Sequence, residues 1–185
     1  MWTLNPERAR LLDIDAFVGD PAVRVAGWLD WRDQAAWTAE PSPAHKALAR
    51  LADVGMLDAV LTQNFDGLHQ AAGMKERQVV ELHGTLRTTS CLGCGHRMDT
   101  ADVVATLAEH PDPACASCGG ILKPDIVYFG EALPEDAINR AVQAASHCDI
   151  FIAIGTTLSV YPVASLAGTA LAADAQLIIV NAEPT

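Results

Sequence analysis

Short apolar runs alternate with amphipathic stretches along most of this chain. Two stretches, residues 134–145 and 163–173, have the spacing of helices that pack one face against a sheet. Runs of four or five mostly apolar residues, typical of strands buried on both faces, occupy residues 58–62, 78–82, 126–129, 150–154 and 176–180. This alternation predicts an α/β fold with a Rossmann-like parallel sheet.

The first 40 residues follow a helical pattern without visible chemistry. We expect them to form the helices of a covering lobe, in which the tryptophans serve as packing residues: Trp2, Trp28, Trp31 and Trp37. Ser42 and Pro43 are typical of a helix N-cap and a first helical residue, so the next helix is expected to run from there to Gly55.

Composition and charge indicate a folded, acidic domain and argue against a nucleic-acid-binding protein. Half of the 185 residues are apolar and 19% are charged, which indicates a folded domain with one core and space for a small lobe. The net charge of −11 argues against nucleic-acid binding and suits an acidic cytosolic protein or a basic peptide partner.

One uncharged run, residues 150–173, is long enough to cross a membrane. Gly155 and Pro162 interrupt it, so a strand, a loop and a helix are the expected structure. The first residues lack the pattern of a signal peptide. Because four of the five cysteines form metal-like pairs, we expect a reducing compartment and hence a cytoplasmic protein.

Two Cys-x-x-Cys pairs, 20 residues apart, predict a closed four-thiolate zinc site: Cys91, Cys94, Cys115 and Cys118. A closed site has no position for water or substrate, so the zinc is expected to be structural. Two redox pairs are the alternative. The surrounding segment, residues 85–123, is too short for an apolar core and is expected to depend on the metal. The fifth cysteine, Cys148, is expected to be an inert buried thiol.

Polar residues follow several of the expected strands. Gly155, Thr156 and Thr157 come after one strand and could bind a phosphate, although many strand-to-helix turns have this composition. Asn181 and Glu183 follow the next strand, where an acid can accept hydrogen bonds from ribose; Glu183 is equally compatible with a solvated loop acid. His83 also ends an apolar strand and could act as a base, although a lone histidine is more often structural.

Five motifs in this order resemble those of the sirtuins: Thr62–His69, His83-Gly84, the two cysteine pairs, Lys123–Glu131 and Gly155–Pro162. Pro41–His45 and Asn181–Glu183 also fit, and the resemblance extends from about Trp2 to Thr185. It implies a sirtuin-type catalytic domain over residues 1–185, with a Rossmann-type part and a small lobe that combines a zinc ribbon at about 85–123 with a helical insertion.

The resemblance implies NAD-dependent removal of acyl groups from protein lysines. In that reaction the acyl oxygen attacks C1′ of the nicotinamide ribose as nicotinamide leaves, and O-acyl-ADP-ribose and the free lysine are the other products. NAD⁺ is then a co-substrate and Zn²⁺ a structural ion. His83 would be the general base that deprotonates a ribose hydroxyl. Acetyl is the default acyl group, and neither a nucleic acid nor a membrane is an expected partner.

The resemblance also assigns binding residues. Those expected to line the nicotinamide and ribose pocket are Gln63, Asn64 and Asp66. Those expected at the adenosine-side phosphate and riboses are Gly155, Thr156, Thr157, Asn181 and Glu183. Those expected to form an edge that pairs with the acyl-lysine peptide by strand addition are Val127, Phe129, Gly130 and Glu131.

The sequence departs from the family pattern at both ends. The opening Gly-Ala-Gly-x-Ser strand and the Ser-Gly-Ile-Pro-x-Phe-Arg segment of sirtuins do not occur in it. It also stops two residues after Glu183, where sirtuins usually have a further strand. We therefore expect a domain truncated at both ends, with poor NAD binding, little turnover and exposed apolar surface beside residues 150–154 or 59–61. The alternatives are an inactive, zinc-stabilised remnant that binds acyl-lysine peptides, and an NAD-dependent ADP-ribosyltransferase.

Overall fold

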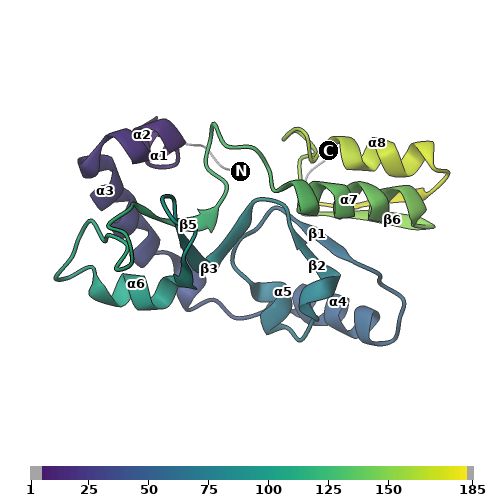
Figure 1. Cartoon of the computed structure of the whole chain (residues 1–185). Coiled ribbons are helices and arrows are strands. Elements are labelled where there is room, and N and C mark those ends of the chain that lie inside the picture. Colours follow the sequence, from purple (N-terminus) through teal and green to yellow (C-terminus); the bar gives the residue numbers. More distant parts are fainter. Residues whose placement is uncertain (1–5, 183–185) are drawn as a thin grey trace.

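The computed structural model describes residues 6–182, which form two groups of elements (Figure 1). One group contains α1 (Pro6–Leu11), α2 (Ile14–Gly19), α3 (Pro21–Arg32), the 3-10 turn η1 (Ala35–Trp37), β3 (Gly84–Cys91), β4 (Arg97–Asp99), α6 (Thr100–Thr106) and β5 (Leu122–Ile126). The other contains α4 (Pro43–Asp53), β1 (Val60–Thr62), α5 (Leu68–Ala71), the 3-10 turn η2 (Glu76–Gln78), β2 (Val79–Glu81), α7 (Glu135–His147), β6 (Ile150–Ile154), α8 (Ser165–Ala172) and β7 (Gln176–Val180). Trp2 and Glu183 lie outside the described residues.

The parallel strands form two separate pairs. β1 pairs with β2, placing Leu61 opposite Val80, and β6 pairs with β7, placing Ile152 opposite Ile178. Both pairs share one apolar cluster with α7 and α8, in which Ala141 and Ala145 are fully buried. The α/β class with an incomplete parallel sheet is therefore confirmed. Within residues 6–182, β1 and β6 each hydrogen-bond to a single strand, so each has an open edge.

One face of the β6–β7 pair is apolar and uncovered. The side chains of Ile150, Ile152 and Ile154 remain 43–49% exposed, and Val180 of the neighbouring strand is 53% exposed. Parallel strands are normally covered on both faces, because their side chains are apolar on both. The exposed apolar surface that the sequence predicted beside residues 150–154 is therefore confirmed.

The helix that begins at Pro43 forms as the sequence predicts. The Ser42 hydroxyl accepts a hydrogen bond from the His45 amide, and the His45 ring accepts one from the Ser42 amide, which together make a capping box. The helix ends at Asp53, and Gly55 follows with a φ of +75°. That left-handed conformation favours glycine and turns the chain toward β1.

The helices at the start of the chain and the cysteine-bearing segment share one apolar core. Phe17 and Trp28 are fully buried there together with Trp31, Leu86 and Val103. Trp37 is 37% exposed, and its indole N–H donates to the Trp31 carbonyl. The expected packing role is thus confirmed for Trp28 and Trp31. The segment 85–123 does not rely on metal alone, because the N-terminal helices supply the other half of its core.

The prediction of a strand over residues 126–129 is wrong. β5 comprises residues 122–126 and pairs antiparallel with β3, while residues 127–131 form a loop. The loop leaves the sheet because Phe129 forms an isolated bridge with Asp13 and because Gly130 turns the chain with a φ of +91°. The apolar residues at 126–129 thus continue into a loop rather than a longer strand.

The uncharged run at residues 150–173 divides as expected. It forms β6, an irregular loop and α8, and no helix within residues 6–182 has the length and hydropathy needed to cross a membrane. α8 begins at Ser165, two residues later than the sequence pattern indicated.

Candidate functional site

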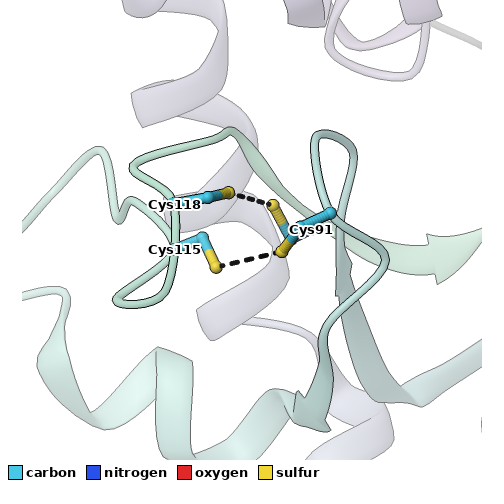
Figure 2. Close-up of side chains that lie close together, drawn as sticks. Cys91, Cys115 and Cys118 are labelled. Atoms are coloured by element: carbon cyan, nitrogen blue, oxygen red, sulfur yellow. Dashed lines mark hydrogen bonds between the residues drawn. The ribbon is translucent and has the colours of Figure 1, made fainter.

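The four paired cysteines converge on one point. Their sulfur atoms all lie within 4.8 Å of one another, with Cys91 and Cys118 at 3.4 Å and Cys94 and Cys115 at 3.7 Å (Figure 2). Four thiol donors at this separation suit a tetrahedral zinc ion. Gly120 allows the approach, because a Cβ at that position would lie 2.9 Å from the Cys91 sulfur.

The backbone around Cys91 favours the thiolate form of this residue. The amides of Cys94 and Gly93 point at the Cys91 sulfur, the latter at 3.3 Å, and lower the pKa of this thiol to about 6. A thiolate is the form that binds metal. Cys91 and Cys115 are buried while Cys94 and Cys118 are exposed, so an ion could reach the site from one side. Cys148 lies apart and donates to the Ala145 carbonyl.

His83 is held in one orientation by the loop after β1. Its Nδ1 lies 3.2 Å from the Gln63 carbonyl oxygen, which can only accept, so Nδ1 carries the proton. In the neutral ring Nε2 then has the free lone pair, and it has no hydrogen-bond partner among residues 6–182. Burial lowers the pKa of His83, although the Gln63 carbonyl opposes this, so the ring is neutral near pH 7. This is the state that a general base requires.

The backbone conformation at position 84 explains why a glycine follows His83. Its φ is +76°, and a Cβ there would collide with the carbonyl oxygen of Asp125 on β5. Only glycine lets β5 approach β3 so closely at this point. The His83 carbonyl in turn accepts from the Val127 amide at 2.9 Å. The candidate base and the loop after β5 are therefore joined by a single backbone hydrogen bond.

The loop after β1 is organised by its own side chains. The Thr62 hydroxyl accepts from the Asn64 amide at 3.0 Å, and the Asp66 carboxylate accepts from the Leu68 amide at 3.0 Å. Gln63 and Asp66 are half-buried and Asn64 is exposed. One oxygen of Asp66 is thereby used, and the second remains available for a ribose hydroxyl or an amide.

Two histidines lie side by side behind this loop, with their rings tilted at 57° to each other. The rings of His45 and His69 lie 4.7 Å apart between centroids, and the buried Nδ1 of His69 has no partner among the described residues. Burial lowers the pKa of His69, and His45 adds to that effect while Asp66 opposes it. No sequence pattern indicated a role for either histidine, because their contact depends on how α4 and α5 pack.

Gly155 and Asn181 bring the ends of β6 and β7 together. The Gly155 amide donates to the Val180 carbonyl at 2.9 Å, and the Asn181 side chain donates to the Thr156 carbonyl at 3.1 Å. The hydroxyls of Thr156 and Thr157 bond within the loop, to the Leu158 amide and the Ser159 hydroxyl. Gly155 has a φ of +61° and open space on its Cβ side. A nucleotide could approach there, but the Gly155 amide is already used.

The loop after β5 presents Phe129 outward and Tyr128 inward. Phe129 is 54% exposed, and both of its backbone groups are bonded: its amide to the Leu12 carbonyl at 2.7 Å and its carbonyl to the Ile14 amide at 3.0 Å. Among the described residues, the Val127 carbonyl and the Gly130 amide have no partner. A bound peptide would have to use these two groups.

The structure brings some of the sequence-predicted residues into contact, but at two separate places. Gln63 and His83 are in contact, and so are Thr156 and Asn181. The two contacts belong to different strand pairs, which are not hydrogen-bonded to each other in the described part. The sequence reasoning named Lys123 only as the first residue of the motif Lys123–Glu131 and missed its role as a buried cation behind the loop at 127–131.

Comparison with known proteins identifies the family. The family model described as the Sir2 family matches residues 3–162. A relative from Streptomyces coelicolor named NAD-dependent protein deacetylase 2 is 47% identical over the whole of this chain, which spans 77% of that relative. NAD-dependent protein deacylase 2 from Pyrobaculum aerophilum is 42% identical over 92% of this chain, which spans 66% of it.

Solved structures show the same likeness. A complex titled "Sir2-p53 peptide-NAD+" superposes with a TM-score of 0.89 at 34% identity, over 98% of this chain and 75% of the other. "The structure of Sir2Af2 bound to a myristoylated histone peptide" superposes with a TM-score of 0.81 at 40% identity, over 95% of this chain and 73% of the other. The chain belongs to the Sir2 family. The family members that it resembles are named NAD-dependent protein deacetylases and deacylases.

Proposed function

We propose that this chain removes acyl groups, acetyl by default, from lysine side chains of proteins in an NAD-dependent reaction, with His83 as the general base. The observation that carries the proposal is the hydrogen bond from His83 Nδ1 to the Gln63 carbonyl. It fixes the tautomer that leaves Nε2 free to take a proton. NAD⁺, when bound, supplies the electrophilic ribose carbon and the hydroxyl groups on which this base acts.

Residues of three loops would bind the two substrates. Gln63, Asn64 and Asp66 supply amide and carboxylate groups beside His83 for the nicotinamide and its ribose. Asn181 holds the loop at 155–157 for the adenosine side, with Glu183 proposed beside it. The acyl-lysine peptide would add as a strand along Val127, Phe129, Gly130 and Glu131. The Gly155 amide donates to the Val180 carbonyl, so it is not available as a donor to a phosphate.

The cysteine cluster would serve this site as a support. A zinc ion held by Cys91, Cys94, Cys115 and Cys118 would fix one end of β3, whose other end follows His83 directly. Because the thiolates must stay reduced to bind the metal, we place the protein in the cytoplasm.

The test measures three products from one reaction. The whole chain is incubated with NAD⁺ and an acetyl-lysine peptide, and nicotinamide, free peptide lysine and acetylated ADP-ribose are quantified by mass spectrometry. The His83→Ala variant should lose free lysine and acetylated ADP-ribose and should release no more than about one nicotinamide per chain, and the control His110→Ala, at an exposed position, should keep all three products. Transfer of ADP-ribose to protein without deacetylation would favour the transferase instead. Peptide binding without any nicotinamide release would indicate a binding remnant.

A further inference from the structure

Lys123 is a buried cation with a full set of partners. Its side chain is 7% exposed, and Nζ lies 3.0 Å from a carboxylate oxygen of Glu131. The ammonium also donates to the carbonyls of Ile126 at 2.7 Å and Pro124 at 3.1 Å, and lies 4.4 Å from the centre of the Tyr128 ring. A buried charge is costly unless it is paired, so these contacts fix where Glu131 and Tyr128 can lie.

Glu131 connects the Lys123 ammonium to the backbone of the loop at 127–131. The carboxylate oxygen that pairs with Lys123 also accepts from the Tyr128 amide at 2.7 Å, and the Glu131 amide donates to the Tyr128 carbonyl at 3.0 Å. One oxygen atom thus joins a cation on β5 to a peptide bond in the middle of the loop. The Glu131 side chain points into the protein and not toward an incoming peptide.

Tyr128 anchors the loop from below. Its ring is 2% exposed and meets Phe17 edge to face at 5.2 Å, and its hydroxyl accepts from the Trp31 indole at 2.7 Å. With Tyr128 held inward, Phe129 must face outward, because successive side chains of extended backbone point to opposite sides. The orientation of the exposed loop is therefore decided by groups beneath it.

We propose that Lys123 and Glu131 are positioning residues for substrate: the ion pair between the buried Lys123 and the partly buried Glu131 holds residues 127–130 in the shape that accepts an acyl-lysine peptide. The proposal rests on the proposed function, since it takes this loop as the peptide-binding edge. The ion pair holds the peptide-binding loop in its bound shape before the peptide arrives, so binding costs less conformational entropy of the loop. The Val127 carbonyl and Gly130 amide, which have no partner within residues 6–182, are thereby held in place for strand addition.

The test compares the unaltered protein with four variants by the binding of a fluorescent acetyl-lysine peptide, followed by anisotropy. Lys123→Met leaves the Glu131 carboxylate without its cation, and it should weaken binding at least about tenfold, since breaking a buried pair from one side is costly. Glu131→Gln should weaken binding as well. The double variant removes both charges but keeps an amide oxygen for the Tyr128 N–H, so it should bind more tightly than Lys123→Met alone. Lys46→Met, at an exposed residue of α4, is the matched control and should bind like the unaltered protein.

Hydrogen exchange separates this proposal from the function on which it rests. In the free protein, Lys123→Met should speed exchange of the Tyr128 and Phe129 amides, while the amides of α7 keep their protection. Unchanged exchange together with unchanged peptide binding would overturn the positioning role. If the unaltered protein binds no acyl-lysine peptide but the loop amides respond as expected, the loop-holding role stands and the proposed function fails. General loss of protection and of zinc in Lys123→Met would shift the decision to Glu131→Gln, which must then show the local effect.

Discussion

The Nδ1 atom of His83 lies 3.2 Å from the carbonyl oxygen of Gln63. Two residues 20 positions apart are thereby joined at the ends of neighbouring parallel strands, and the imidazole has one permitted tautomer. Because burial outweighs this hydrogen bond, the pKa of His83 lies below its usual value of 6.5.

The first prediction concerns the titration of His83. A lowered pKa means that the neutral ring persists below pH 6.5, so the base should stay available in mildly acidic solution. In an NMR titration of the whole chain, the ring signal that disappears in His83→Gln should titrate with a midpoint below 6.5. The acid limb of deacetylation should follow the same midpoint. A midpoint above 6.5 would contradict the burial argument.

A second prediction concerns stability and the buried histidine pair. The pKa of His69 is lowered in the folded protein, so the unfolded chain binds more protons once the pH falls below 6.5. The stabilisation is complete above pH 6.5 and is lost as the pH falls toward the folded-state pKa. The midpoint of urea unfolding should therefore drop between pH 7 and 5. His69→Gln should show a shallower drop, and equal slopes in both proteins would rule out His69 as the cause.

Metal removal gives the third prediction. Each chain should contain one zinc ion, and a chelator should release it with loss of protection at residues 91–98 and 115–120. The buried core that joins Trp28, Leu86 and Val103 includes Cys91 and Cys115 but is built mostly from apolar side chains, so α3 should keep most of its protection. Elemental analysis and hydrogen exchange measure the two effects. Cys91→Ser should lose the zinc, whereas Cys148→Ser, outside the cluster, should retain it; simultaneous unfolding of α3 would show that the metal supports the whole lobe.

The fourth prediction concerns the uncovered face of β6 and β7. Ile152 and Ile178 lie opposite each other on it and are both 43% exposed. Replacing both with threonine keeps β-branched side chains and removes apolar surface from water, so binding of the dye ANS should fall. Stability should change by only about 0.5 kcal/mol per site, as expected for exposed positions. Undiminished dye binding would mean that this face is covered in solution.

The sequence predicted the local elements well where a physical rule acts on neighbouring residues. Ser42 and Pro43 begin their helix as expected, because a cap depends only on the first turn. The cysteine spacing predicted the cluster for a similar reason, since each pair is held by its own turn. The strand expected at 126–129 failed because the course of the loop is set by Leu12 and Ile14, more than 100 residues earlier in the chain.

The sequence predicted which residues belong to the candidate site but not how their side chains are held. The resemblance named His83, but its tautomer follows from the Gln63 carbonyl, which no sequence pattern shows. The role of Lys123 was missed because a lysine is expected at the surface, and its burial depends on Glu131 and on the Tyr128 ring. The sequence also suggested that residues 155–157 could bind a phosphate, and the structure shows that the Gly155 amide already donates to the Val180 carbonyl of β7.

The hydrogen bond between the Val127 amide and the His83 carbonyl has a consequence for engineering this protein. A redesign of residues 127–130 to accept a different peptide sequence would displace the backbone of the base by way of this bond. Selectivity and rate are thus mechanically linked, and libraries that vary the loop should be screened for both traits at once. Variants that change side chains while leaving the Val127 backbone in place offer the best chance of altering one trait alone.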